Sequence, residues 1–256
     1  MTSITPAQAA KIFLRPQKKT NPSDPMGLPG SQRNDFAFEG MKLAWWSVGT
    51  GPMVFLLHGW EGSSADMTPF AAPLRSAGFS VAALDLPAHG ASEGTFVSLF
   101  QFTRAVKQLL DHTGHPHAFI AHSVGCPAVI EAIRAGIKVD AVVLIGTPAR
   151  YKDQAFLVAS HLGLDRDGTK QMLDELKSMD VDVAAINTPL AVHDLKVAGL
   201  VIHSDDDKVI PHVLGKEVAD AWPGAKFMPM SGWGHRRILS SPEVVAAAVE
   251  FVGRMK

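Results

Sequence analysis

Ser123 is the residue of this sequence best placed to act as a nucleophile. It lies at the centre of Ala121-His122-Ser123-Val124-Gly125, between a short apolar run and a stretch with helical spacing. A sharp turn from strand to helix needs small residues two positions before and after its apex, because the two arms nearly touch there, and Ala121 and Gly125 meet that need. The apex hydroxyl then projects from the edge of a sheet, where it can attack a carbonyl carbon. Taken alone, the pattern also fits a serine that caps a helix.

A second segment offers hydrogen-bond donors for such an attack. Leu57-His58-Gly59-Trp60-Glu61-Gly62 follows an earlier apolar run. A turn here directs the backbone N–H of Trp60 towards Ser123, and Val124 offers a second N–H directly after the nucleophile. Two aimed N–H groups are what the oxyanion of a tetrahedral intermediate requires. We interpret His58 as a structural residue that fixes this loop by hydrogen bonding, and not as a base.

Two later segments contain the partners that a serine nucleophile needs. Asp205, Asp206 and Asp207 follow one apolar run, and His235 follows the last one. Serine is a weak nucleophile until an imidazole takes its proton, and a carboxylate holds that imidazole in the correct tautomer. The chain order serine, aspartate, histidine, each after a separate strand, is expected when all three meet at the carboxyl edge of one parallel sheet.

The elements that must position these residues are indicated by the hydrophobic pattern. After about residue 40, short apolar runs alternate with longer segments of helical period, which is typical of a mainly parallel sheet covered by helices on both faces. The predicted strands are Lys42–Val48, Val54–Leu57, Val81–Leu84, Phe119–Ala121, Ala141–Ile145, Gly199–Ile202 and Lys226–Met228. The predicted helices are Ser98–His112, Val124–Ala135, Val213–Ala221 and Val244–Val252.

Two segments fall outside this alternation. Residues 1–40 contain Pro16, Pro22, Pro25 and Pro29, and we predict an N-terminal arm over the surface with an early antiparallel strand. Residues of about 151–195 are more than a connection between two strands requires. Because they carry two amphipathic pieces, we expect a small helical cap inserted into a main domain of residues 41–256.

The composition excludes several classes of protein. Of the 256 residues 46% are hydrophobic, and 24 basic against 25 acidic residues give a formal net charge of −1. These values are ordinary for a globular protein and unlike the basic surface of a nucleic-acid binder. Cys126 is the single cysteine, so an intrachain disulfide is impossible. With no signal-peptide pattern and no apolar run approaching the ~20 residues that span a bilayer, we expect a soluble, cytoplasmic protein.

Taken in order, these segments resemble the α/β-hydrolase superfamily from about Phe36 onward. The matching pieces are His58 to Gly62, Asp85 to Ser92, the turn around Ser123, Asp207 with Ile210-Pro211, and Gly234-His235. The resemblance implies the α/β-hydrolase fold and the serine hydrolase class, with no metal or organic cofactor. The superfamily most often has glycine where Ala121 stands, and alanine is a common small substitute.

The resemblance also selects among the three aspartates. Superfamily members usually show the catalytic acid followed shortly by an apolar residue and proline, which fits Asp207 with Ile210-Pro211. Asp205 and Asp206 are then interpreted as solvated turn charges. Asp85 and His89 resemble a structural loop of the superfamily. Cys126 is expected to pack beneath the turn at Ser123, and Trp60 and Trp233 are candidate substrate-binding residues.

The sequence therefore predicts a hydrolase of a small to medium carboxylic ester or thioester. Ser123 would attack, His235 would carry the proton, Asp207 would orient His235, and the N–H groups of Trp60 and Val124 would hold the oxyanion. A different class remains open, namely a small-molecule binding or receptor-like protein on the same fold with little turnover, because fold does not imply function.

Overall fold

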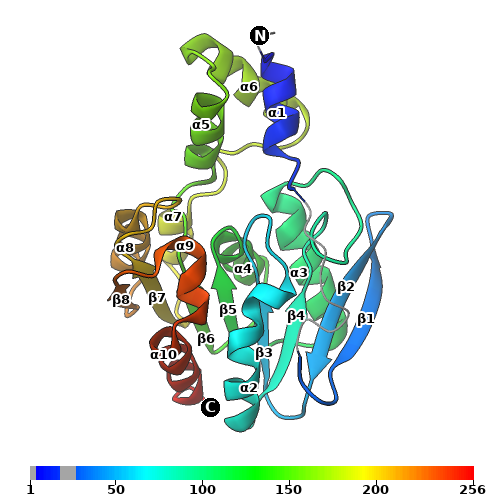
Figure 1. The fold of residues 1–256 in the computed structure, drawn as a ribbon, viewed down its shortest axis with the longest axis vertical. Helices are drawn as coiled ribbons and strands as arrows, with labels where there is room; N and C mark the ends of the chain where they lie inside the picture. Colours follow the sequence, from blue (N-terminus) through cyan, green and yellow to red (C-terminus); the bar gives the residue numbers. More distant parts are fainter. Residues whose placement is uncertain (1–3, 18–26) are drawn as a thin grey trace.

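A mixed sheet forms the centre of the computed structural model, which describes residues 4–17 and 27–256 (Figure 1). The strands are β1 (Gln32–Phe38), β2 (Met41–Val48), β3 (Met53–Leu57), β4 (Ser80–Leu84), β5 (Ala118–His122), β6 (Ala141–Ile145), β7 (Ala198–Ser204) and β8 (Lys226–Met230). Each predicted strand is found within two residues of its expected ends. The parts of the predicted arm at 1–3 and 18–26, with Pro22 and Pro25, lie outside the described residues.

The strand order is β1-β2-β4-β3-β5-β6-β7-β8. Strands β3 to β8 pair in parallel, whereas β2 pairs antiparallel with both β1 and β4. The chain moves from β3 to β4 on one side and then continues with β5 on the other side. In open α/β sheets, ligands bind at the carboxyl ends of the strands where the order reverses in this way. The topology therefore points to the ends of β3 and β5.

Helices cover both faces of the sheet. Helices α3 (Leu99–Thr113), α4 (Gly125–Arg134) and α8 (His212–Ala221) pack on one face, and α2 (Thr68–Ser76) and α10 (Pro242–Gly253) pack on the other. Successive strand residues alternate between the two apolar clusters, so that Phe55 and Phe119 face α3 and α4 while Leu56 and Ile120 face α2 and α10. This arrangement confirms the predicted fold class.

Helix α2 was not among the predicted helices. Pro73 lies inside it and lacks the N–H that an interior helical residue normally donates. The helix forms because Phe70 and Leu74 are fully buried against the sheet, so that tertiary packing outweighs the lost hydrogen bond.

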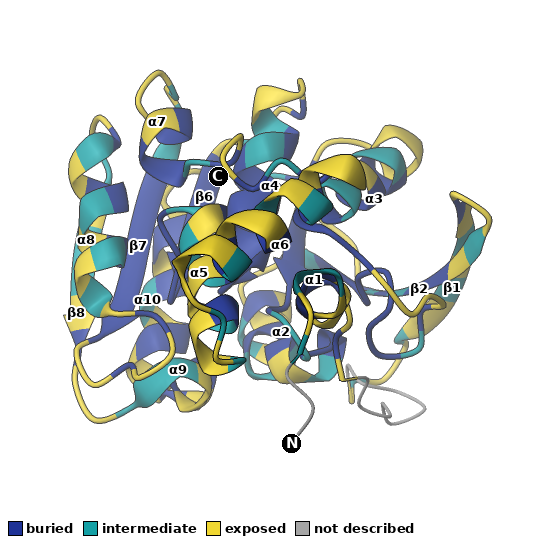
Figure 2. Ribbon diagram, turned by 90° about the horizontal axis from the view of Figure 1, so that it is seen from above, coloured by how far each residue is buried: buried dark blue, intermediate teal, exposed yellow. Residues whose placement is uncertain are grey.

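The segment expected as a cap holds α5 (Tyr151–His161), α6 (Arg166–Ser178) and α7 (Thr188–Val192). Helices α5 and α6 stand above the carboxyl ends of the strands, whereas α7 lies back against α4 and α8 (Figures 1 and 2). The remaining short elements are α9 (Gly234–Arg237) and two 3-10 turns, Ser64–Met67 and Ile238–Ser240. No helix within the described residues is long and apolar enough to cross a membrane.

A further helix, α1 (Pro6–Phe13), lies within the segment predicted as an arm and packs against α5 and α6. Eight residues are too few for a stable isolated helix, so the helix depends on burying Ala9, Ala10 and Phe13 against the cap. The sequence does contain its start signal, because Thr5 and Gln8 form a capping box around Pro6.

The loop after β3 is held by His58, as interpreted from the sequence. The ring is fully buried, its Nε2 accepts the N–H of Leu86 at 3.0 Å, and its Nδ1 lies 2.7 Å from the carbonyl oxygen of Gly59. Because a backbone N–H can only donate, Nε2 carries no proton and Nδ1 is the donor. Burial lowers the pKa of His58 to about 4. Asp85 is likewise structural, since its carboxylate accepts the N–H groups of Ser64 and Ala91 at 2.7 and 2.6 Å.

The lowered pKa of His58 predicts an acid-sensitive fold. Below about pH 6.5 the unfolded chain binds a proton at this residue that the folded chain excludes down to about pH 4. The contribution of His58 to the free energy of unfolding is therefore fully present above about pH 6.5 and is lost at on the order of 1 kcal/mol per pH unit between about pH 6.5 and 4. Urea unfolding of the wild type and His58→Gln at several pH values measures this contribution. The variant should be less stable at neutral pH and should lose stability less steeply on acidification; two parallel pH curves would contradict the assignment.

Candidate active site

The turn between β5 and α4 places Ser123 at its apex. Ser123 has a φ of +52°, a conformation that non-glycine residues rarely adopt, and its N–H donates to the carbonyl oxygen of Ile145 at 2.9 Å. A Cβ added to Gly125 would lie 2.6 Å from the carbonyl oxygen of His58, and one added to Gly59 would lie 2.8 Å from the Cβ of Ser123. Both positions therefore require glycine for the two loops to meet.

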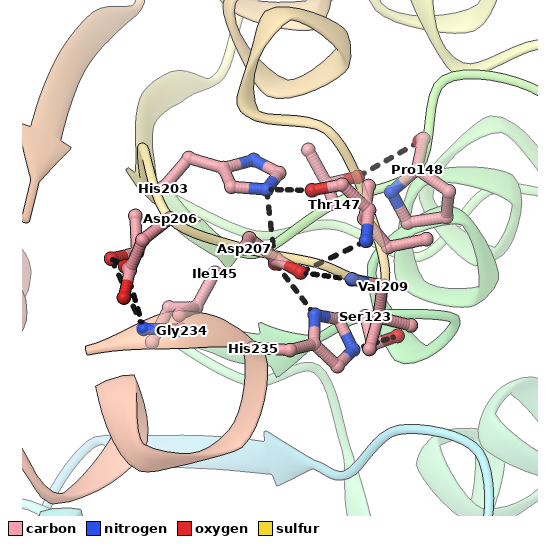
Figure 3. A network of polar contacts seen from close by, with 12 residues as sticks. Ser123, Ile145, Thr147, Pro148, His203, Asp206, Asp207, Val209, Gly234 and His235 are labelled. Atoms are coloured by element: carbon pink, nitrogen blue, oxygen red, sulfur yellow. Dashed lines mark hydrogen bonds and ion pairs between the residues drawn. The ribbon is translucent and has the colours of Figure 1, made fainter. Parts of the chain in front are cut away.

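The structure brings Ser123, His235 and Asp207 together from three strand ends (Figure 3). The Nε2 of His235 lies 3.0 Å from the Oγ of Ser123, and its Nδ1 lies 2.7 Å from Oδ2 of Asp207. A hydrogen on Nδ1 would be donated to the carboxylate, which leaves Nε2 free to accept the hydroxyl proton. This is the relay geometry of an activated serine.

Asp207 is a buried carboxylate with several donors. Its side chain is 1% exposed, its Oδ1 accepts the N–H groups of Val209 and Ile210 at 2.8 and 2.9 Å, and its Oδ2 faces His203 as well as His235. Burial opposes ionisation of the group. The hydrogen bonds from His203, His235 and Ile210 outweigh burial and hold the pKa of Asp207 well below its usual range.

His203 is a site residue to which sequence reasoning gave no role. Its Nε2 lies 3.2 Å from Oδ2 of Asp207 and 2.9 Å from the carbonyl oxygen of Ile210. Since both partners are acceptors, Nε2 carries the proton. Gly215 of α8 packs on the other side of the ring, where a Cβ would lie 2.2 Å from Nδ1. A histidine at the end of an otherwise apolar strand, four residues before the acid, was the available signal.

The two neighbouring aspartates differ from each other. Both are exposed, as expected, but Asp206 accepts hydrogen bonds from the Oγ of Ser204 at 2.5 Å and the N–H of Gly234 at 2.9 Å. These bonds fix the turn that precedes His235, so Asp206 is more than a solvated charge. The Asp205 side chain has no such bond among the described residues, and its backbone N–H donates to Met230.

Two further reactive side chains close to Ser123, those of Cys126 and His122, are buried and make hydrogen bonds to the backbone. Cys126 is fully buried, donates to the carbonyl oxygen of Ala121 at 3.2 Å, and has its thiol pKa raised to about 12 by burial. A thiol in this state does not compete as a nucleophile. The Nε2 of His122 lies 2.8 Å from the backbone oxygen of His235, and burial lowers the pKa of His122 to about 3.

A pocket of about 230 Å³ opens beside the Ser123 hydroxyl. It is lined by Ser123, His235, Trp60 and Val124 among others. The backbone N–H groups of Trp60 and Val124 donate to no acceptor within the described residues. Trp60 and Val124 therefore bring two unpaired backbone donors to the lining of this pocket.

Trp233, the other tryptophan expected at the substrate, does not line this pocket. Its ring packs against the apolar cluster of α2 and α10. The backbone of this turn is held by Ser204, whose Oγ accepts the N–H groups of Trp233 and Gly234 at 3.3 and 3.2 Å. Elsewhere, no group of three or more His, Cys, Asp or Glu side chains in the described ranges is arranged to hold a metal ion.

Other known proteins share this fold. The chain is 28% identical over 251 residues to a candidate non-heme haloperoxidase of Mycobacterium phage D29, covering 81% of this chain and 90% of the relative. Among solved structures, a bromoperoxidase from Bacillus anthracis superposes with a TM-score of 0.67 at 19% identity, covering 83% of this chain and 95% of the other. A bacterial membrane phospholipase A gives a TM-score of 0.70 at 16% identity, with 90% and 88% covered. A model of the alpha/beta hydrolase family matches residues 54–248, more than two thirds of the chain. The chain therefore belongs to the alpha/beta hydrolase family.

Proposed function

We propose that this chain is a serine hydrolase that cleaves a carboxylic ester or thioester of a small to medium substrate through an acyl-enzyme. The observation that carries the proposal is the unbroken series of hydrogen bonds from Ser123 through His235 to Asp207. A protein of the same fold that only binds a small molecule does not need such a proton relay. Nor does it need two unpaired backbone donors in the lining of the same pocket.

In the first half of the reaction, the Oγ of Ser123 attacks the carbonyl carbon while Nε2 of His235 accepts the hydroxyl proton. The carbonyl oxygen becomes an oxyanion held by the N–H groups of Trp60 and Val124, and each such donor is worth roughly 3 to 4 kcal/mol in the transition state. Asp207 stabilises the imidazolium. When the intermediate collapses, the bond to the alcohol or thiol breaks, and His235 returns its proton to that leaving group.

In the second half, water replaces the leaving group. Nε2 of His235 takes a proton from the water as its oxygen attacks the acyl carbon, and the same two N–H groups hold the second oxyanion. Collapse of this intermediate breaks the bond between the acyl carbon and Oγ of Ser123. The proton passes from His235 to Ser123, and the carboxylic acid is released.

The nucleophile is tested by covalent labelling. A fluorophosphonate should label Ser123 alone, because only a serine activated by an imidazole attacks phosphorus rapidly. Ser123→Ala should abolish labelling and turnover of a short-chain activated ester, with little loss of melting temperature. Ser178→Ala, which changes an exposed serine of α6, serves as the matched control. Undiminished labelling of the Ser123 variant would place the nucleophile elsewhere, and absence of both labelling and turnover in the wild type would favour the binding-protein alternative.

The acid is tested by comparing two aspartates of one turn. Asp207→Asn removes the charge that stabilises the imidazolium and permits the wrong tautomer, and the equivalent change in a serine protease costs about 10⁴ in kcat. We expect a loss of that order here, against less than about tenfold for Asp205→Asn, whose side chain is exposed. The measurement is kcat on one ester for both variants, with melting curves as a check on folding. If Asp205→Asn were almost inactive while Asp207→Asn stayed active, the acid that orients His235 would be Asp205 and not Asp207.

The base is tested by the pH dependence of kcat/KM. His235 must be neutral to accept the serine proton, so kcat/KM should increase with pH across the range in which histidines titrate. Asp207 does not contribute to this rise, because its lowered pKa keeps it ionised throughout the range. Rates from about pH 5 to 9 on a substrate whose chemistry limits turnover provide the test. A flat profile is incompatible with His235 as the base.

A further inference from the structure

Residues 5–17, here called the N-terminal segment, supply the lining residue Phe13 to the pocket and contact three separate parts of the protein. Helix α1 packs against α5 and α6 (Figures 1 and 2). Beyond the helix, the carbonyl oxygen of Leu14 accepts the N–H of Val97 at 2.8 Å. The N–H of Gln17 donates to Oε1 of Glu61 at 3.0 Å. Because Glu61 directly follows Trp60, the segment links the cap to the loop that carries a proposed oxyanion donor.

Phe13, the last residue of α1, forms part of the wall of the pocket. It is 7% exposed, and it lines the same pocket as Ser123 and His235. Its ring centroid lies 5.2 Å from that of Tyr151, at the start of α5, which also lines the pocket. Val158 and Ile210 add further apolar lining, and Glu61, Gln154 and Arg236 also line the pocket. An aromatic pair, one ring from α1 and one from the cap, therefore forms part of the pocket wall.

One ring of this pair, that of Phe13, comes from outside the part of the chain that the family model matches. The family model begins at residue 54, and Phe13 precedes it by 41 residues in the sequence. The pocket has a volume of about 230 Å³, so removal of the Phe13 ring from its lining would enlarge it.

We infer that the N-terminal segment determines the substrate range, with Phe13 as the residue that limits the length of the acyl group. The inference rests on the proposed function, and it names the substrate class as esters or thioesters of acids with an apolar chain. The acyl chain extends from the carbonyl carbon at Ser123 towards Phe13 and Tyr151. A longer chain would have to displace the aromatic pair and with it the contact between α1 and α5.

The first test measures kcat/KM for p-nitrophenyl esters of straight-chain acids of increasing length. For the wild type, kcat/KM should rise with chain length to an optimum and then fall. Phe13→Ala should move the optimum to longer chains and improve the first rejected esters by roughly tenfold or more, the range of effects seen when a pocket gains or loses methylene-sized space. Phe13→Leu, which preserves more of the packing in α1, should give a smaller shift in the same direction.

The matched control is Ile12→Ala on the same helix, because Ile12 is 45% exposed and does not line this pocket. It should leave the optimum chain length unchanged. Equal chain-length profiles for the wild type, Phe13→Ala and Phe13→Leu would overturn the inference. So would a profile that shifts equally in the Ile12 variant, since the effect would then belong to the helix as a whole.

A binding experiment separates this inference from the proposed chemistry. Methyl ketones of increasing chain length are titrated calorimetrically into Ser123→Ala, with and without Phe13→Ala, so that no nucleophile is needed. The limiting chain length should increase when Phe13 is removed. If the limiting chain length increases while the wild type hydrolyses no ester, the proposed function is wrong, but Phe13 still limits the length of the bound chain. If Phe13→Ala does not change ketone binding while esters are hydrolysed, the proposed function holds and the inference about Phe13 is wrong.

Discussion

The close approach of two loops at the ends of β3 and β5 is the constraint on which the rest of the site depends. Gly59 faces the Cβ of Ser123 and Gly125 faces the carbonyl oxygen of His58, at separations that no side chain would permit. The approach brings the N–H of Trp60 and that of Val124 to one pocket. It also forces Ser123 into a positive φ, a strain of roughly 1–3 kcal/mol that persists because the surrounding strands determine the turn.

A buried charge is the second requirement of the site. Asp207 is almost fully enclosed, and an unpaired carboxylate in that position would become neutral and lose its value as an orienting group. Two backbone N–H groups on one oxygen and two histidines on the other keep it ionised. The carboxylate that orients His235 is thus itself oriented by β7, by the turn before α8 and by His203, which α8 holds through Gly215.

The cap region shows how a short helix becomes part of a site. Helix α1 has too few residues to be stable alone, but it packs against α5 and α6. The residues that follow it are held by backbone hydrogen bonds of Leu14 and Gln17. Its last side chain, Phe13, then lines the pocket together with Tyr151. Stability of the cap and shape of the pocket are consequently coupled, because the same packing produces both.

The sequence by itself determined the features that depend on local physics. Fully buried strands read as continuous apolar runs, and the turn at Ser123 could be recognised because only small residues fit two positions from its apex. The strand-by-strand order of Ser123, Asp207 and His235 then predicted one edge of one sheet, where the structure brings them within hydrogen-bond distance. Only the tertiary structure decided several side-chain contacts of the site. His203 lies only four residues before Asp207, but its contact with the carboxylate depends on how the turn after β7 folds back. The position of Phe13 depends on α1 docking on the cap, and that of the Trp233 ring depends on the apolar cluster of α2 and α10. The last two positions have no local sequence pattern, since each results from packing between elements that the chain forms separately.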